Sequence, residues 1–202
     1  MTAELSNELG ILIKRLELLN APVLRFLNPP IEEQKLIFFF NQYFPTATIS
    51  EDIKDLFLLY NGTATDYVQA AEVFYLFPGF FFNSIEEIQE AIKADENIFE
   101  FKTKGFLPLF SSGRGEYLAL NLNEFSNKPK TTPIYYLSTW NPELELYTTI
   151  YDSFRQMLVT VNKCFKYDAY FMSSVHFMLD YDYKKYNKIS KEMNPNSEYW
   201  KL

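Results

Sequence analysis

A predicted β-hairpin constrains the fold of this chain more than any other segment. Two apolar runs, residues 106–110 and 117–122, flank the loop Ser111–Glu116, which contains Gly113 and Gly115. Short apolar runs joined by a glycine-containing loop are typical of paired antiparallel strands, since glycine takes the positive φ angles that tight turns need. The sequence therefore predicts two neighbouring antiparallel strands near its centre.

Helices are predicted on both sides of this hairpin. Apolar side chains recur at helical spacing in residues 3–20, after Asn28-Pro29-Pro30, and after the serines at positions 50, 84 and 153. Serine suits the position before a helix because its side-chain oxygen accepts a free backbone N–H. Asn28 is interpreted in the same way, as a cap with the two prolines in the first helical turn.

Other local signals mark where helices begin and end. Ser84 precedes Glu87 by three residues, and Ser153 precedes Gln156 by three, which is the spacing of a capping box. Gly62 follows an apolar helical stripe, so it is interpreted as the left-handed exit of the helix that starts after Ser50.

The order of these elements predicts the fold class. Further strands are expected at residues 133–137 and 144–150, an extended segment with a Pro78-Gly79 turn at residues 73–82, and a last helix at residues 182–193. Residues 169–180 fit either a helix or a strand. Helices, then hairpin-linked strands, then helices again predict an α+β fold, with a mainly antiparallel sheet and helices packed on one face.

The composition fits one domain. At 202 residues and 48% hydrophobic content the chain can bury one good core, and no long Pro/Gly/Ser-rich linker divides it. We therefore predict a single domain over residues 1–202. The aromatic content of 18%, from 20 Phe and 15 Tyr, can supply a partner-binding surface as well as a core.

The cellular setting is predicted from cysteine content and the N-terminus. Cys164 is the only cysteine, which excludes an intramolecular disulfide and a disulfide-stapled secreted design. The first residues carry acids where a signal peptide would carry Lys or Arg, and no stretch approaches about 18 uncharged apolar residues. We expect a soluble, cytoplasmic protein with no membrane partner.

Charge is unevenly distributed along the chain. The net charge is -7, but residues 1–101 carry 16 acids against 6 bases, whereas residues 102–202 carry 10 acids and 13 bases. An acidic half repels nucleic acid and acidic membranes and attracts basic partners. The alternative is a solvated surface that only keeps the protein soluble.

Several of these features occur in an order that resembles the SUKH superfamily, the fold of the Smi/Knr yeast cell-wall regulators and of many bacterial immunity proteins. They are the Asn-Pro-Pro segment, the Leu59-Tyr60-Asn61-Gly62 exit, the Ser84-Ile85-Glu86-Glu87 start, the hairpin and the Ser153-Phe154 helix start. The resemblance covers about residues 27–165 and leaves an N-terminal helix and a C-terminal extension, residues 168–202, outside. It implies binding to other proteins, and the family has no universal catalytic set.

The resemblance implies two classes of function. One is an immunity protein that binds and blocks a bacterial toxin, often a nuclease; the other is a regulatory or scaffolding module similar to the cell-wall regulators. The acidic first half agrees with the first class, because a nuclease carries positive charge to hold phosphates. The expected partner is then a basic protein toxin.

Candidate partner-binding residues are acids near two predicted helix starts and two aromatic residues in turn-like, polar surroundings. The acids are Glu51, Asp52, Asp55, Glu86, Glu87 and Glu90, and the aromatic anchors are Tyr67 and Trp140. Because exposed acids are common on soluble proteins, solvated charge and helix capping are the alternative interpretation.

Catalytic, metal and nucleotide sites have little support in the sequence. Cys164 and His176 would have to meet in space with an orienting third group, and a single Cys and a single His cannot supply a structural zinc site. Gly113-Arg114-Gly115 lacks the Lys-Ser/Thr ending and the helix of a phosphate loop. The lysine run at residues 184–191 contains no Arg. We therefore expect no enzymatic activity, no cofactor, no metal and no nucleic-acid partner.

Overall fold

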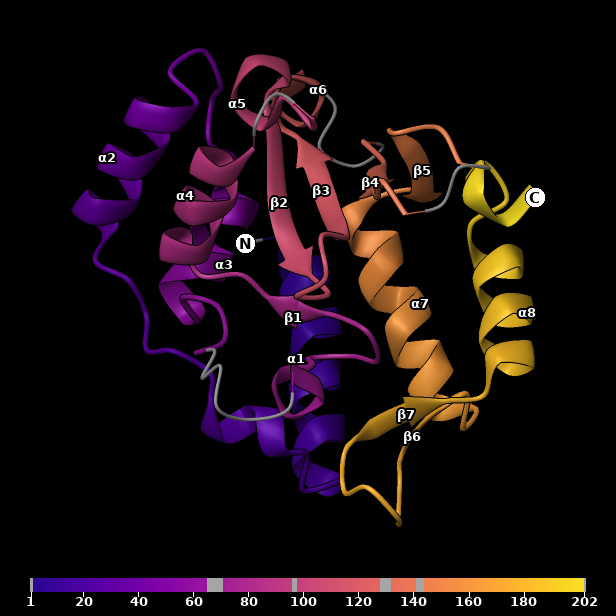
Figure 1. Ribbon diagram of the computed structural model, residues 1–202. Coiled ribbons are helices and arrows are strands. Elements are labelled where there is room, and N and C mark those ends of the chain that lie inside the picture. The colour runs from indigo at the N-terminus through magenta and orange to yellow at the C-terminus, as the bar shows by residue number, and fades with distance from the viewer. Residues whose placement is uncertain (1, 65–70, 96–97, 128–131, 141–143, 202) are drawn as a thin grey trace.

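A computed structural model describes residues 2–64, 71–95, 98–127, 132–140 and 144–201 of this chain (Figure 1). Its α-helices are α1 (Ala3–Leu18), α2 (Glu33–Tyr43), α3 (Glu51–Leu59), α4 (Ile85–Ala94), α5 (Phe101–Lys104), α6 (Leu122–Asn127), α7 (Phe154–Lys166) and α8 (Tyr183–Met193). Its strands are β1 (Phe81–Phe82), β2 (Phe106–Ser111), β3 (Tyr117–Asn121), β4 (Ile134–Leu137), β5 (Thr148–Tyr151), β6 (Tyr170–Met172) and β7 (Leu179–Tyr181).

Five strands form one antiparallel sheet in the order of the sequence, β1-β2-β3-β4-β5. The predicted hairpin is its centre, because β2 and β3 pair from Phe106 opposite Asn121 to Ser111 opposite Tyr117. β6 and β7 form a separate two-stranded ribbon. The α+β class with a mainly antiparallel sheet is therefore confirmed.

Alternation along the strands gives the sheet two different faces. Leu118 and Leu120 of β3 belong to the main hydrophobic core, whereas Ala119 between them belongs to a second, smaller cluster. The main core also receives buried side chains from α1, α2, α3, α4, α7 and α8. The long helices thus contribute to the core on one face of the sheet, as predicted.

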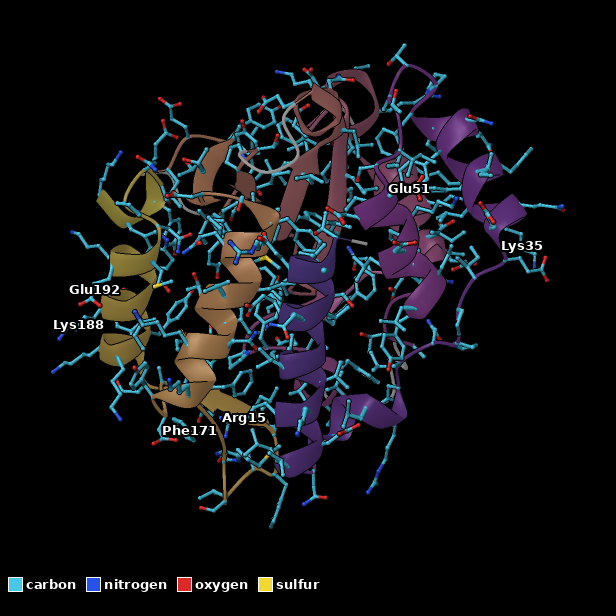
Figure 2. All side chains as sticks on the ribbon, turned by 180° about the vertical axis from the view of Figure 1, so that it is seen from behind. Arg15, Lys35, Glu51, Phe171, Lys188 and Glu192 are labelled. Carbon is cyan, nitrogen blue, oxygen red and sulfur yellow. The ribbon has the colours of Figure 1, made fainter. Side chains whose placement is uncertain are left out.

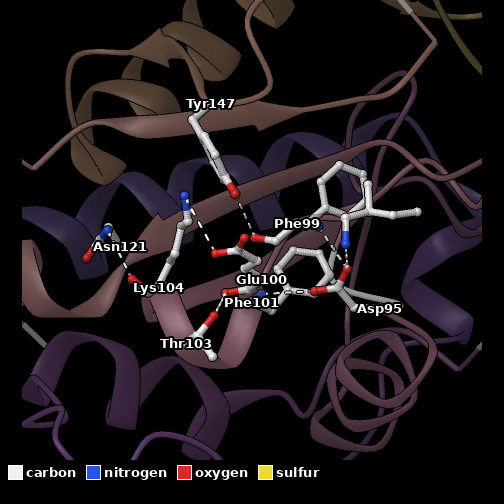
Figure 3. A network of polar contacts seen from close by, with 9 residues as sticks. Asp95, Phe99, Glu100, Phe101, Thr103, Lys104, Asn121 and Tyr147 are labelled. Atoms are coloured by element: carbon white, nitrogen blue, oxygen red, sulfur yellow. Dashed lines mark hydrogen bonds and ion pairs between the residues drawn. The ribbon is translucent and has the colours of Figure 1, made fainter.

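An aromatic cluster covers part of the other face (Figure 3). Phe99 and Phe101 pack there, and Asp95 fixes the backbone that carries them by accepting the N–H groups of Phe99 (2.8 Å) and Phe101 (3.0 Å). The Tyr147 hydroxyl donates to the carbonyl of Phe99 (3.2 Å). A short loop and α5 therefore cover this face, together with Ala91 and Ile92 from the end of α4.

Both predicted serine caps of the later helices are present. The Ser84 hydroxyl accepts the N–H of Glu87 (3.2 Å) and the Glu87 carboxylate accepts the N–H of Ser84 (2.7 Å), which completes a capping box. Ser153 accepts the N–H of Gln156 (3.0 Å), but the Gln156 side chain donates to the carbonyl of Met193 (2.7 Å). The reciprocal half of the second box is lost because tertiary packing offers Gln156 a different acceptor.

The predicted start of the second helix is wrong. α2 begins at Glu33, so Asn28 is not its cap. The Asn28 amide donates to the carbonyl of Asn61 (2.9 Å), and its N–H donates to the carbonyl of Gly62 (2.9 Å). Asn28 therefore donates to a distant segment of the chain, whereas a cap would accept a helix N–H with its side-chain oxygen.

The predicted exit of the third helix also needs correction. α3 ends at Leu59, and Tyr60 after it is extended, with φ -145° and ψ 129°. Gly62 does have a positive φ of 74°, but it lies beyond the helix. Gly62 instead lies against the backbone of Asn83 and Ser84, directly before α4.

The structure corrects the predictions for two further segments and decides between the two alternatives for a third. Residues 71–74 form a 3₁₀ helix, and only Phe77 and Phe80 bridge around the Pro78-Gly79 turn before β1. β5 begins at Thr148, four residues later than predicted. Residues 170–181 are the β6–β7 hairpin, which settles the choice between helix and strand, and the predicted lysine-rich helix is α8, capped by Asp182.

The C-terminal extension packs against the edge of the main sheet. Ser197 donates its hydroxyl to the carbonyl of Thr149 (2.7 Å), and the Trp200 indole donates to the carbonyl of Ile150 (2.6 Å). β5 is an edge strand, and unpaired edges are prone to pair with other chains. Residues after α8 therefore protect part of this edge. No helix in the described ranges is both long and apolar enough to span a bilayer.

Candidate functional site

The first group of predicted acids lies at the start of α3, where Ser50 accepts the N–H of Ile53 (3.3 Å). Glu51 is exposed, and Figure 2 shows it on the same side of the molecule as Lys35. Asp52 is half-buried, and its carboxylate accepts the backbone N–H of Thr2. Asp55 is also half-buried. Of this group, only Glu51 projects fully into solvent.

The second group lies at the start of α4 and divides in the same way. Glu86 and Glu90 are exposed; Glu86 accepts the side-chain amide of Asn61 (3.0 Å), and Glu90 forms an ion pair with Lys93 (2.9 Å). Glu87 is half-buried because its carboxylate is turned back to the N–H of Ser84 in the capping box. Capping therefore occupies Glu87, while Glu86 and Glu90 are presented to solvent.

The two acidic groups do not form one cluster. Asn61, two residues after α3, accepts the N–H of Ile85 at the start of α4 (3.1 Å). The end of α3 therefore contacts the start of α4, and Glu51 lies at the far end of α3. Eight helical steps separate Glu51 from Leu59, which is about 12 Å along the axis.

The predicted aromatic anchors lie elsewhere. Trp140 is 73% exposed, and its indole donates to the carbonyl of Arg114 in the β2–β3 loop (2.8 Å). This bond fixes the ring against the hairpin, so Trp140 is an ordered aromatic surface. Tyr67 lies outside the described residues.

A groove that sequence reasoning missed lies between α2 and α4. It has a volume of about 360 Å³, and Phe38, Phe39, Tyr43 and Ile85 supply its apolar lining. Phe38 is 69% exposed although Phe39 beside it is buried. The sequence contains a signal for this groove, because Phe38 lies outside the helical stripe of apolar residues that places Phe39 and Tyr43 in the core.

Both signs of charge occur at this groove and on the helices that form it. Residues 32–43 and 84–94 together carry five glutamates and two lysines. Glu32 and Lys35 line the groove and form an ion pair (3.6 Å), and both are well exposed. Glu86 adjoins the lining residue Ile85, and Glu90 adjoins the lining residue Gln89. The groove therefore has an apolar centre and one ion pair in its lining, and the exposed Glu86 and Glu90 lie on α4 next in sequence to lining residues.

A larger cleft of about 650 Å³ lies where α1, α3 and α7 begin. Asp52 lines it together with Glu4, Asp152 and Arg155. Arg155 pairs with Glu4 (3.4 Å), and the Asn196 amide donates to Asp152 (2.9 Å). The carboxylates of Asp52, Glu4 and Asp152 each interact with a donor group of the chain itself. The cleft is therefore a junction between the terminal segments and the core.

The residues considered for catalysis occupy different environments. Cys164 is fully buried in α7, and this burial raises the pKa of its thiol to about 12, so the reactive thiolate is suppressed at neutral pH. His176 is exposed in the β6–β7 loop. Gly113 and Gly115 have positive φ angles of 74° and 83° and lead into β3, as a hairpin loop requires. Within the described ranges, no group of three or more His, Cys, Asp or Glu is arranged to hold a metal ion.

Comparison with known proteins places the chain in a family. A sequence profile described as the SMI1/KNR4 family (SUKH-1) matches residues 40–160, which is more than half of the chain. The match runs from the end of α2 through the main sheet and into α7. Among curated proteins, none matches this sequence. The extent of the profile match decides the assignment, and the chain belongs to the SMI1/KNR4 (SUKH-1) family.

Proposed function

We propose that this chain is a non-enzymatic protein-binding module, and that it neutralises a basic protein toxin by direct binding, as an immunity protein. The observation that carries the proposal is the α2–α4 groove, which an exposed Phe38 lines, on a helix pair whose α4 also presents Glu86 and Glu90 to solvent. Aromatic side chains in a recess, surrounded by polar groups that exclude water, are typical of the energetic centre of protein interfaces.

The exposed acids of α3 and α4 support a basic partner. Glu51, Glu86 and Glu90 are all exposed on these two helices. A nuclease toxin needs positive charge to bind phosphates, and complementary charge speeds association and selects partners. A regulatory or scaffolding role is the alternative that the family also supports. A toxin gene beside the gene for this chain would favour the immunity role, and its absence would favour the alternative.

Reversing three exposed acids tests the acidic surface. The triple variant Glu51→Lys, Glu86→Lys, Glu90→Lys should slow association with the toxin encoded by the neighbouring gene. We expect a change of about ten-fold at low salt, because long-range electrostatic attraction is lost. The dependence of the association rate on salt should weaken as well. Stopped-flow fluorescence over a series of salt concentrations measures both effects.

A matched control separates the exposed acids of α3 and α4 from net charge alone. The variant Glu17→Lys, Glu145→Lys, Glu192→Lys changes the charge equally at exposed sites outside α2, α3 and α4. Figure 2 shows Glu192 on the side of the molecule opposite Lys35 and Glu51. Equal slowing by both triple variants would show a general charge effect and would contradict binding at this surface. Unchanged association rates in the Glu51, Glu86 and Glu90 triple variant would make Trp140 and the sheet the next candidates for the binding surface.

The proposed lack of enzymatic turnover has a separate test. Replacing Cys164 and His176 together by Ala should leave protection against the toxin intact, with a loss of stability of about 1 kcal/mol from the buried Cys164. Cell survival and thermal unfolding measure the two quantities. Loss of protection in a variant that folds normally would show that one of these side chains has a chemical role.

A further inference from the structure

The outer edge of β5 depends on another segment for protection. Edge strands are often protected by charged side chains or proline, but residues 148–151 contain neither and consist of residue types that favour strands. The opposite edge, β1, is only two residues long, and a short edge pairs poorly with other strands. Residues 195–201, here called the strap, lie outside β5 at the rim of the molecule (Figure 1). The strap therefore covers the edge of the sheet that is suited to accept another strand.

The strap holds β5 through side chains. The Ser197 hydroxyl donates to the carbonyl of Thr149 (2.7 Å), and the Trp200 indole donates to the carbonyl of Ile150 (2.6 Å). In the part of the chain that the structure describes, no backbone-to-backbone hydrogen bond joins the strap to β5. The strap thus satisfies carbonyl groups of the edge without adding a strand to the sheet.

Thr149 shows which way the backbone of this edge faces. Its carbonyl accepts the Ser197 hydroxyl, and its N–H donates to the Glu198 carboxylate (3.4 Å). In antiparallel pairing, the N–H and C=O of one residue bond to the same neighbouring strand. Both groups of Thr149 point toward the strap and away from β4, which is the arrangement that a further antiparallel strand needs.

Few groups of the strap are buried. Trp200 is its one large buried side chain, 7% exposed, and packs against Tyr186 with 5.4 Å between the ring centroids. Four of the seven strap residues are exposed, and its only regular structure is the single 3₁₀ turn Tyr199–Lys201. Segments with few buried apolar contacts open at a lower free energy than the core of a protein. The strap therefore has the features of a segment that opens by itself, with the buried Asn194 as its fixed point.

We propose that the strap opens separately from the rest of the fold, and that its opening lets β5 pair antiparallel with β5 of a second copy. A two-fold axis at Thr149 lets the two Thr149 residues exchange both backbone hydrogen bonds and places Thr148 opposite Ile150. These cross-strand pairs are favourable and bring no like charges together. The pair joins two five-stranded sheets into one. The closed strap is thus a regulatory device that keeps the chain monomeric.

Hydrogen exchange in the unaltered chain tests separate opening. The indole N–H of Trp200 is buried against β5, whereas the backbone N–H of Leu120 lies in the central strand β3. The protection factor of the indole N–H should be at least about 100-fold lower than that of Leu120, and it should depend less on added urea. Nuclear magnetic resonance measures both sites. Exchange of the two groups only through global unfolding would overturn the proposal.

Releasing the strap in the full chain tests the pairing. Ser197→Ala with Trp200→Ala should give a dimer at about 0.1 mM in sedimentation equilibrium, whereas the unaltered chain should be monomeric. Adding Thr149→Pro removes the outward N–H that the pair needs and should restore the monomer, because proline is tolerated where an edge N–H faces solvent. A folded strap variant that stays monomeric, or a dimer that survives Thr149→Pro, would contradict pairing through β5.

Two further variants keep this experiment decisive. Trp140→Ala removes the other indole-to-carbonyl bond of the chain, which lies at the β2–β3 loop and guards no strand edge, and this variant should stay monomeric. Ser197→Ala with Glu198→Ala frees the same groups of Thr149 but retains Trp200, so it tests the pairing if the Trp200→Ala variant does not fold. We expect it to dimerise about ten-fold more weakly, and a monomer at about 1 mM would contradict the proposal. No toxin is present in these experiments, so their outcome is independent of the immunity role.

Discussion

Gly62→Ala is expected to lower the free energy of unfolding by about 3 kcal/mol or more. A Cβ atom at position 62 would lie 2.1 Å from the backbone nitrogen of Ser84 and 2.5 Å from the carbonyl carbon of Asn83. These are backbone atoms next to the capping box of α4, and they cannot rotate away as a side chain would. The positive φ of 74° adds strain of about 1–2 kcal/mol to the collision. Urea unfolding followed by circular dichroism measures the change.

Gly79→Ala is the matched control for this prediction. Gly79 has a φ of 90°, but a Cβ atom there would meet no heavy atom within 4 Å. The control therefore carries conformational strain without a collision, and we expect a loss of about 1–2 kcal/mol. Equal losses at the two positions would show that the close approach of residue 62 to the start of α4 is not a major constraint.

Asn194→Ala is expected to cost about 3 kcal/mol, because Asn194 is fully buried and joins three parts of the chain. Its amide donates to the hydroxyl of Thr160 in α7 (3.0 Å) and to the carbonyl of Ser190 in α8 (2.9 Å). Its side-chain oxygen accepts the N–H of Asp152 (3.1 Å). Alanine leaves a cavity and removes the partner of the Asp152 N–H. The loss should appear in the same unfolding assay.

The exposed Asn196 offers a comparison two residues away. Its amide donates to the Asp152 carboxylate (2.9 Å), but the bond is open to solvent. Asn196→Ala should therefore change the free energy of unfolding by less than about 1 kcal/mol. If Asn194→Ala is equally mild, the C-terminal extension is not an integral part of the fold, and its removal after Met193 should then be tolerated.

Features that depend on a few neighbouring residues were readable in the sequence. The Ser84 capping box requires only Ser84 and Glu87, and both of its hydrogen bonds are present. The β2–β3 hairpin requires two apolar runs and a glycine-containing loop, and it forms the centre of the sheet. The family resemblance rests on the order of such local features, and the profile match confirms it.

The environment of a residue that contacts a distant part of the chain could not be read in this way. Asn28 has the sequence context of a helix cap, but it donates to the carbonyl groups of Asn61 and Gly62, and α2 begins only at Glu33. Among the candidate acids, Glu86 and Glu87 are neighbours of the same type, and only the capping geometry decides that Glu86 is the exposed one. Periodicity gives the direction of a side chain from its helix, but not the element it meets.

The helices with clear caps, the central hairpin, the α+β class and the family were predictable from the amino-acid sequence, because each depends on local hydrogen bonding or on the order of local signals. The groove between α2 and α4, the close approach of Gly62 to α4 and the junction at Asn194 became visible only in the folded chain. Each of these features brings together residues from elements separated in the sequence by at least one other segment. Their geometry follows from how the helices pack on the sheet, which spacing along one chain segment does not specify.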